Sequence, residues 1–361
     1  MSRNYLIFNI IWLIIQRLIE VNCEIKPQRR IHHSATYINN KLYILGGQDI
    51  DETDVDGVDN KTLILYGGRS FQTNVNMNLV YMFDTESESW KTTAENYTHK
   101  RSLSGLINSN GKMYLFGGRF DYGRIVNDIL IFDTVNTSWR NVTDSSAPAP
   151  RINYGAVLLP NQTIIYLGGM NANNGSYSLR EVYLYDTNND HWDVKLSTGS
   201  IPSNRHGFSA VLGLNGQQII IFGGRNEKLN EFDPSNSLYT LNINSLQWNI
   251  PNVSGKIPKS RHNHKANVFR KYMVISFGTN YDQKDESDIL LLDINDNNKF
   301  KWTSLKHNNN KLEILLIIGS IIVIIVTVAS IGIYKYKKRK ETQYEIDVDR
   351  VPLDDLSFLG N

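Results

Sequence analysis

The chain has 361 residues and a formal net charge of +2, from 38 basic and 36 acidic side chains. It contains a single cysteine, which excludes a fold stapled by disulfides. The basic residues are not pooled in one patch of the kind that binds nucleic acid, so the sequence predicts no nucleic-acid partner.

The first segment, residues 1–23, has the pattern of a signal peptide. Arg3 precedes a run from Tyr5 to Ile15 that is apolar apart from Asn9. This run is too short to span a bilayer, and the residues up to Cys23 resemble a small-x-small cleavage site. The alternatives are an uncleaved anchor or an apolar N-terminal helix. Cleavage after Cys23 would leave a mature chain without cysteine.

Paired glycines recur along the chain, each at the end of an apolar run typical of a β-strand. After Gly68, successive pairs lie 50, 51 and 55 residues apart, and successive tryptophans lie 49, 53, 56 and 54 residues apart. One unit of about 50 residues is therefore repeated. The runs are Leu42–Gly47, Leu63–Gly68, Met113–Gly118, Ile164–Gly169, Gln218–Gly224 and a worn copy, Met273–Gly278, in which Thr279 is expected to replace the second glycine; the tryptophans are Trp90, Trp139, Trp192, Trp248 and Trp302.

The interior of each unit predicts four short strands. In the copy from Arg205 to Trp248, the turn Asn215-Gly216 separates two apolar runs, which is a strong hairpin signal. An aspartate that ends the third strand can cap the turn leading to the tryptophan strand. The tryptophan is expected to be buried. The aspartates are Asp84, Asp133, Asp186 and Asp293.

A Pro-x-x-Arg motif precedes four units, and a fifth is expected to keep only Arg101. With the paired glycines, the third-strand aspartate and the tryptophan in this order, the chain resembles the kelch repeat over Arg30 to about Lys306. The resemblance implies an all-β fold, a kelch β-propeller of four-stranded blades. The motifs are Pro27 with Arg30, Pro148 with Arg151, Pro202 with Arg205 and Pro258 with Arg261.

The first repeat is shorter than the others. Its glycine pairs, Gly46-Gly47 and Gly67-Gly68, are 21 residues apart, with no tryptophan between them. Relative to a period of about 50 residues, the third strand, the fourth strand and the next first strand are expected to be missing. The sequence therefore predicts five complete four-stranded blades plus a truncated sixth. The alternative is five blades with an extra hairpin on the first.

The acidic stretch Asp49–Asp59 resembles a calcium loop. It lacks the glutamate expected at the twelfth position, where Leu63 stands. We therefore expect a solvated loop here.

A C-terminal transmembrane helix is predicted over residues 312–334. Ile314 to Tyr334 carry no charge, and five of the six residues from Lys335 to Lys340 are basic. This pattern predicts a single-pass type I protein in the lipid bilayer, with an extracellular or luminal propeller over residues 24–311 and a cytosolic tail over residues 335–361. Single-pass kelch proteins of this layout are familiar from fungi.

Seven Asn-x-Ser/Thr sequons lie between the two apolar ends, as expected for a secreted domain. Asparagine is abundant in this chain, so chance is the alternative explanation. Asn161, close to a second strand, is the least favourable acceptor. The other candidate N-glycosylation sites are Asn60, Asn96, Asn136, Asn141, Asn174 and Asn252.

No catalytic, cofactor or metal site is predicted. The resemblance extends to galactose oxidase, whose copper site needs a tyrosine joined to a cysteine, but Cys23 lies outside the propeller. The propeller histidines are expected to make structural hydrogen bonds. His262 and His264, two apart on a predicted strand and therefore on one face, are the least implausible metal pair.

The predicted function is a non-enzymatic recognition scaffold that binds an unidentified protein or glycan partner. Kelch propellers generally bind through loops on one face, and the segments between second and third strands vary in length here. Four of their residues, Tyr122, Arg124, Tyr177 and Arg180, have side chains favoured at binding hot spots. The alternatives are an extracellular carbohydrate-binding module and a degenerate galactose-oxidase-like enzyme. The variable segments are Phe120–Val126, Met170–Leu179 and Asn226–Asn236.

Overall fold

The computed structural model describes residues 33–38, 41–46, 50–57, 61–70, 80–93, 100–120, 122–226, 236–280 and 288–303. The regular structure in these ranges is β-strand, confirming the all-β class. The strands are β1 His33–Ile38, β2 Lys41–Gly46, β3 Ile50–Gly57, β4 Thr62–Ser70, β5 Val80–Asp84, β6 Ser89–Thr93, β7 Lys100–Arg101, β8 Gly105–Ile107, β9 Lys112–Phe116, β10 Arg119–Phe120, β11 Ile129–Asp133, β12 Ser138–Val142, β13 Gly155–Leu158, β14 Thr163–Leu167, β15 Glu181–Asp186, β16 His191–Leu196, β17 Thr198–Gly199, β18 Ser209–Leu212, β19 Gln218–Phe222, β20 Leu238–Asn242, β21 Gln247–Asn249, β22 Asn252–Gly255, β23 Arg261–His262, β24 Lys265–Phe269, β25 Tyr272–Ser276, β26 Thr279–Asn280, β27 Ile289–Asp293 and β28 Lys299–Thr303.

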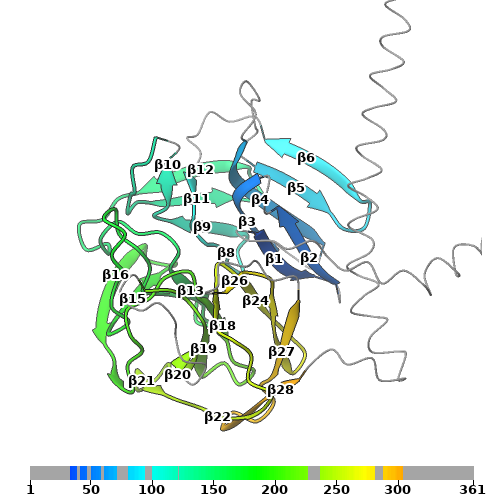
Figure 1. Ribbon diagram of the computed structural model, residues 1–361. Coiled ribbons are helices and arrows are strands. Elements are labelled where there is room, and N and C mark those ends of the chain that lie inside the picture. The colour runs from blue at the N-terminus through cyan, green and yellow to red at the C-terminus, as the bar shows by residue number, and fades with distance from the viewer. Residues whose placement is uncertain are drawn as a thin grey trace, which may run out of the picture. The chain divides into compact units, whose positions relative to one another are not determined.

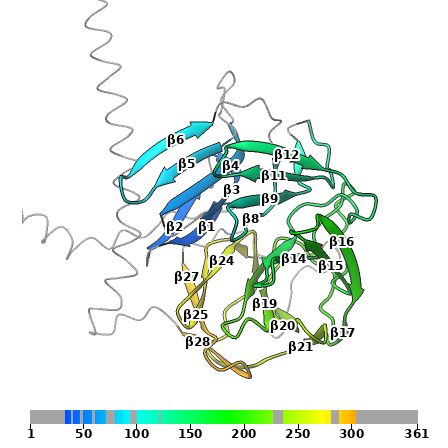
Figure 2. The ribbon, with the colours of Figure 1, turned by 180° about the vertical axis from the view of Figure 1, so that it is seen from behind.

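Five antiparallel sheets form the blades of a propeller (Figures 1 and 2). In each blade, four antiparallel strands follow one another in chain order from the axis to the outer edge, which confirms the predicted repeat. In blades 4 and 5 a short parallel strand, β17 or β22, is added at the outer edge. The blades are blade 1 (β3–β6), blade 2 (β8, β9, β11, β12), blade 3 (β13–β16), blade 4 (β18–β21) and blade 5 (β24, β25, β27, β28).

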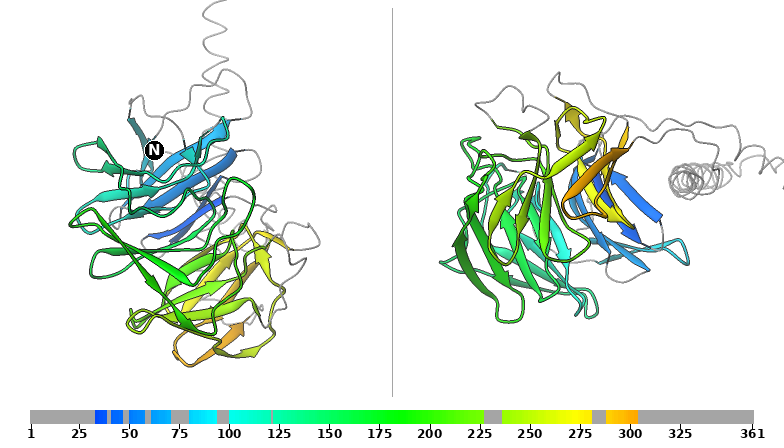
Figure 3. Two further views of the ribbon diagram at one scale, coloured as in Figure 1. Left: turned by 90° about the vertical axis from the view of Figure 1, so that its left-hand side faces the viewer. Right: turned by 90° about the horizontal axis from the view of Figure 1, so that it is seen from below.

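The first strands of neighbouring blades lie side by side in the order β3, β8, β13, β18 and β24. The N-terminal hairpin, β1 and β2, is a separate two-stranded sheet. Its strand β1 contacts both β24 and β3, and the Asn267 amide of β24 donates a hydrogen bond of 3.1 Å to the Ala35 carbonyl of β1. The hairpin therefore lies between blade 5 and blade 1, as Figures 1 and 3 show.

The expectation of a solvated loop over Asp49–Asp59 is wrong. Residues Ile50–Gly57 form β3, the first strand of blade 1, which pairs with the apolar strand β4 from Ile50↔Ser70 to Gly57↔Leu63. The acidic residues of β3 are untypical of a strand, so the sequence did not predict one here. The segment is a strand because its backbone pairs with that of β4. The first strand that was expected to be missing is thus present, and the three residues between β2 and β3 leave no room there for a third and a fourth strand.

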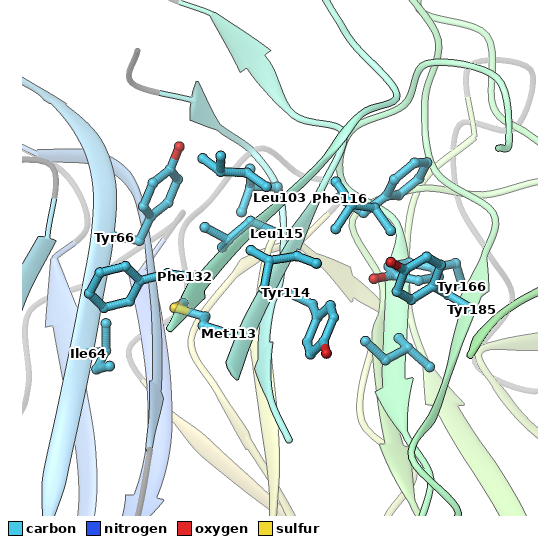
Figure 4. Packing of buried hydrophobic residues seen from close by; sticks show 14 of the residues in the cluster. Ile64, Tyr66, Leu103, Met113, Tyr114, Leu115, Phe116, Phe132, Tyr166 and Tyr185 are labelled. Atoms are coloured by element: carbon cyan, nitrogen blue, oxygen red, sulfur yellow. The ribbon is translucent and has the colours of Figure 1, made fainter. Parts of the chain in front are cut away.

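The core lies between the blades. Second strands are buried along almost their whole length because they are covered on both faces, which explains their unbroken apolar runs. Figure 4 shows Tyr66 of blade 1, Phe116 of blade 2 and Tyr166 of blade 3 in one continuous cluster. The blades are therefore held together by aromatic and aliphatic contacts across their faces.

The tryptophans of the fourth strands pack toward the preceding blade. Trp192 contacts Phe116 of blade 2 at 4.9 Å between ring centroids, and Trp302 contacts Phe222 of blade 4 at 5.1 Å. Trp192, Trp248 and Trp302 are buried, as predicted. The prediction is wrong for Trp90, whose side chain is 39% exposed, and Trp139 is only partly buried.

The third-strand aspartates cap the following turn, as predicted. The Asp133 carboxylate accepts hydrogen bonds of 3.0 Å from the backbone N–H groups of both Val135 and Asn136. In blade 3, the backbone N–H of Asn188, followed by the Asn189 side chain, holds the pKa of Asp186 below its usual range. Blade 4 uses Asn242, which accepts the same pair of bonds without a charge.

Replacing Asp186 by alanine is expected to destabilise the protein by about 1 kcal/mol, through loss of turn hydrogen bonds at a solvent-exposed site. Since the folded pKa of Asp186 is lowered, its contribution is present above the unfolded pKa of about 3.9 and is lost as the pH falls through the folded pKa. Asp186→Asn should keep most of the stability at pH 7 and remove this acid-dependent part. Denaturation midpoints at pH 7 and pH 3 test this, and an unchanged pH dependence in Asp186→Asn would contradict it.

The predicted membrane helix, the tail and the signal segment lie outside the described residues. Within the described residues, no helix has the length and apolar character needed to cross a bilayer.

Candidate recognition face

One end of the propeller carries two kinds of segment, which pair with each other. The segment leading into each first strand lies beside the start of the loop between the second and third strands. In blade 2, β7 pairs with β10, and in blade 5, β23 pairs with β26. Single bridges join Ile152 to Met170 and His206 to Arg225 in blades 3 and 4. We call this end the loop face.

Three of the arginines of the Pro-x-x-Arg motifs, Arg151, Arg205 and Arg261, are buried beneath the loop face, whereas Pro27 and Arg30 lie outside the described residues. In blade 3, Arg151 donates from Nη1 to the Gly168 carbonyl at 2.9 Å, and its own carbonyl accepts the Gly118 N–H of blade 2 at 3.1 Å. Arg205 and Arg261 repeat both bonds in blades 4 and 5. Each arginine therefore braces its own blade with its side chain and the preceding blade with its main chain.

Lys100, not Arg101, occupies the equivalent place in blade 2. Its backbone pairs with Phe120 as that of Arg261 pairs with Asn280, and its side chain is 2% exposed. The Lys100 ammonium donates to Asp128 at 3.0 Å, as the Arg261 guanidinium donates to Asp288 at 2.7 Å. Burial lowers the pKa of Lys100, and the neighbouring carboxylate opposes this shift. The expectation for Arg101 was therefore one position out of register.

Positive φ and close backbone contacts favour paired glycines at these junctions. Gly223 and Gly224 have φ of +69° and +100°, and a Cβ on Gly223 would lie 2.2 Å from the Arg261 carbonyl oxygen. In blade 5, Phe277 at φ 53° stands in the first glycine's place and Gly278 at φ 94° in the second's. The expectation that Thr279 replaces the second glycine is therefore wrong. The first glycine is the one replaced.

Backbone hydrogen bonds link the segments that lead into the first strands, which we call the lead-in segments, from one blade to the next around the axis. The Asn153 N–H donates to the Ser102 carbonyl at 2.9 Å, Gly207 donates to Asn153 at 2.8 Å, and Asn263 donates to Gly207 at 2.8 Å. All four residues have φ between 52° and 64°. The base of the loop face is therefore fixed by main-chain contacts from blade 2 to blade 5.

The four predicted hot-spot residues differ in their surroundings. Tyr122 is 69% exposed and stacks on Phe120, with ring centroids 5.1 Å apart, and Arg124 next to it is exposed. Arg180 is exposed at the start of β15. Tyr177 is half-buried on the Arg151 guanidinium, 4.3 Å from its ring centroid, and donates to the Pro150 carbonyl at 3.1 Å. Tyr177 therefore also supports the fold.

Exposed Arg225 is a loop-face residue that the sequence reasoning missed. It follows a glycine pair directly, as do Arg69 and Arg119, so a recurrent Gly-Gly-Arg signal was present. With Arg124 of blade 2 and Arg180 of blade 3, it gives the loop face three exposed cations in addition to the aromatic pair of Phe120 and Tyr122.

The histidines on this side are used for packing. His206 Nδ1 lies 2.9 Å from the Ser176 hydroxyl, and His264 Nε2 lies 2.9 Å from the Ser209 hydroxyl of blade 4. Asn263, at φ 54°, interrupts the strand, so the alternation argument for His262 and His264 on one face does not hold. Across the described ranges, no group of three or more potential ligands could hold a metal ion.

The sequon asparagines that the structure describes are exposed on turns, a loop and outer strands: Asn136, Asn141, Asn161, Asn174 and Asn252. Asn161 accepts the Thr163 N–H at 3.1 Å. Asn60 and Asn96 lie outside the described residues. In Asn174-Gly175-Ser176, the serine is buried against His206, so its hydroxyl is accessible only before this part folds.

These junctions and blades define a β-propeller of the kelch type. A family model described as the Attractin/LZTR1 beta-propeller matches residues 63–325, more than half of the chain, and the chain belongs to this family.

Curated relatives carry the same repeat. Kelch domain-containing protein 3 of Rattus norvegicus is 29% identical over 259 residues, and the match covers 64% of this chain and 64% of that protein. Host cell factor 1 of Homo sapiens is 24% identical over 193 residues, which are 48% of this chain and 9% of that protein. The chain thus spans less than two thirds of the length of these relatives.

A solved structure of YjhT matches with a TM-score of 0.62 at 14% identity, covering 77% of this chain and 99% of that one. At this identity, the match supports the fold alone.

Proposed function

We propose that the propeller is a non-enzymatic recognition scaffold that binds a protein partner through the loop face. The observation that carries this is the contrast between a rigid base and exposed tips. Backbone bonds and buried arginines fix the base, while Tyr122, Arg124 and Arg180 are exposed. Aromatic and arginine side chains held on a rigid support are typical of binding hot spots. The kelch-type relatives are consistent with such a scaffold.

The partner is expected to present acidic and apolar groups. The exposed cations Arg124, Arg180 and Arg225 favour carboxylates, and the Phe120–Tyr122 stack favours an apolar or aromatic contact. A glycan ligand is the second candidate, because an exposed aromatic ring such as Tyr122 can also cover a sugar face.

Alanine at Tyr122 or Arg124 should weaken partner capture by more than about 1 kcal/mol and leave the melting temperature nearly unchanged. The partner is first identified by proximity labelling from the propeller in the native cell. Leu196→Ala, on the exposed outer strand β16, is the matched control. Tyr177→Ala should weaken capture and also lower stability, since it uncovers Arg151. If the Tyr122→Ala and Arg124→Ala variants capture the partner as well as the unmodified protein does, the recognition surface lies elsewhere.

We also propose the type I topology for this scaffold, with the signal segment cleaved near Cys23. The charge-free stretch Ile314–Tyr334 and the basic flank after it support this orientation. Protease added to intact cells should digest the propeller and spare residues 335–361. A propeller that is protected from the added protease would contradict this orientation.

A further inference from the structure

Strand β16 is the outermost strand of blade 3, and no further strand of the described residues covers its outer edge. In blades 4 and 5 the fourth strand is followed by β17 or β22, whereas the sheet of blade 3 ends at β16 (Figure 1). Among the described strands, β15 is the one partner of β16. Such an edge is a row of backbone donors and acceptors that an added strand can use.

The ladder between β15 and β16 determines which backbone groups face outward. The Ser197 N–H donates to the Arg180 carbonyl at 2.8 Å, so these two opposite residues form a hydrogen-bonded pair. Hydrogen-bonded and non-hydrogen-bonded pairs alternate in an antiparallel ladder. In agreement with this alternation, the Val194 N–H donates to the neighbouring Asp193 carboxylate at 2.8 Å and not to β15. The residues of β16 whose N–H and C=O groups point away from β15 are therefore Trp192, Val194 and Leu196.

The side chains of β16 are unusual for an outer strand. Val194 and Leu196 are 52% and 60% exposed, on the face with which Trp192 packs against blade 2. On the opposite face, the Asp193 carboxylate and the Lys195 ammonium are exposed and lie 3.9 Å apart. None of the other described fourth strands has two exposed large hydrophobic residues. An unpaired edge with exposed apolar side chains is typical of a surface that pairs with another strand.

We propose that β16 is a docking site for β16 of a second copy of this chain, so that two blade 3 sheets join edge to edge. The two strands run antiparallel about a twofold axis at Val194. The outward N–H and C=O groups of Val194 then bond those of Val194 of the second copy, and the outward groups of Trp192 bond those of Leu196 of the second copy. This is an isologous interface, in which both copies use the same surface.

Charge identifies the occupant as a second copy and not an unrelated strand. The register that pairs the outward groups also sets Asp193 directly opposite Lys195 of the second copy, and the symmetry repeats this pair on the other side of the axis. Opposite charges directly across an antiparallel pair stabilise it. The edge of β16 is thus complementary to itself in backbone bonding, in apolar side chains and in charge. The proposal depends neither on the loop face nor on the membrane topology.

Two carboxylates compete with the second copy for the outward N–H groups. Asp193 accepts from the Val194 N–H, and the pKa of Asp144 is held below its usual range mainly by Ser146 and least by the Trp192 N–H. Pairing releases both carboxylates, and Asp193 gains Lys195 of the second copy in exchange. The competition predicts a reversible dimer, and Asp144→Ala should strengthen it.

Charge reversal tests the register in the full-length protein in detergent, by sedimentation velocity over a concentration series. The unmodified protein should form a dimer whose fraction rises with concentration. Asp193→Lys alone and Lys195→Asp alone should each weaken the dimer by at least about tenfold, because two attractive pairs become two repulsive ones. Mixing these two variants should restore it as a heterodimer, since each reversed charge then faces its opposite. Restoration also shows that both variants are folded.

A cysteine at the twofold axis tests the contact directly. Directly opposite residues of a hydrogen-bonded antiparallel pair have Cα atoms about 5.5 Å apart, which a disulfide can bridge. In a chain whose one natural cysteine is replaced, Cys23→Ser, the variant Val194→Cys should form disulfide-linked dimers on mild oxidation. Val135→Cys is the matched control, because Val135 is an exposed valine on a turn of blade 2, away from β16.

Three results would overturn the proposal: a protein that stays monomeric at every concentration, single charge variants that dimerise as well as the unmodified protein, or equal cross-linking of Val194→Cys and Val135→Cys. The first would mean that the two carboxylates keep the edge closed, and the second that the copies meet elsewhere. Tyr122→Ala, on the loop face, should leave the dimer unchanged, and Leu196→Ala should leave partner capture unchanged. Failure of one surface therefore does not imply failure of the other.

Discussion

Replacing Trp248 by alanine is expected to lower the free energy of unfolding by about 3–5 kcal/mol, the usual cost of removing a buried tryptophan side chain. Trp248 is fully buried. Its indole N–H donates to the Leu179 carbonyl at 3.2 Å and to the Ser197 hydroxyl at 3.1 Å, and both acceptors belong to blade 3. The substitution would therefore open a cavity and also remove a bond between blades 3 and 4.

Trp90→Ala is the matched control, because it removes the same side chain from the same blade position. With 39% of Trp90 exposed, less apolar surface returns to water, and a loss of about 1–2 kcal/mol is expected. Urea denaturation followed by circular dichroism measures both variants. Equal losses would mean that the two tryptophans are equally buried, contrary to the structure.

Gly223→Ala should be among the most damaging single-methyl additions in this protein. The positive φ of +69° costs an alanine about 1–2 kcal/mol. The new Cβ would lie 2.2 Å from the Arg261 carbonyl oxygen, a backbone atom that cannot move without disturbing blade 5. Overpacking of this kind adds about 1–3 kcal/mol, for a total of about 2–5 kcal/mol.

Gly123→Ala separates the two causes. Gly123 has φ +92°, and an added Cβ would meet nothing within 4 Å, so only the conformational cost of about 1–2 kcal/mol applies. Thermal melting of the two variants, compared with the unmodified protein, measures the difference. A Gly223→Ala variant as stable as Gly123→Ala would show that the junction between blades 4 and 5 is looser than described.

The repeat could be predicted from the sequence because its signals are chemically strict. A glycine pair such as Gly223-Gly224 satisfies a positive φ and a close backbone approach, and Asp133 caps a turn with its own side chain. Few residue types meet either requirement, so they recur visibly. The regular position of the tryptophan in each repeat likewise predicted the burial of Trp248 in the core.

The sequence-based predictions were wrong where the local structure depends on backbone pairing or on contacts with residues far along the chain. Strand β3 is acidic, and its pairing with β4, which composition does not report, makes it a strand. Lys100 takes the place of an arginine one position before the expected one, because this position holds a buried cation in each described junction, here 3.0 Å from Asp128. Phe277 adopts a glycine-like φ of 53° that tertiary packing imposes. The exposure of Trp90 depends on what adjoins it, which no local pattern encodes.

The candidate site was predictable in part. Loop length and residue type pointed to Tyr122, Arg124 and Arg180, which are exposed on the loop face. The packing of Tyr177 on Arg151 could not be read from the sequence, because the two residues are 26 positions apart and meet only when the lead-in segment reaches the loop.

The hydrogen bonds that join neighbouring blades lie at the base of the variable loops. Gly118 donates to the Arg151 carbonyl and accepts the Val126 N–H at 3.1 Å, so the loop between them starts and ends at the same anchored point. Residues beyond that anchor, such as Tyr122 and Arg124, can change in sequence or number without altering how the blades join. Binding specificity in this propeller can thus diversify by mutation, insertion or grafting at the loop tips while the ring of junctions is inherited intact.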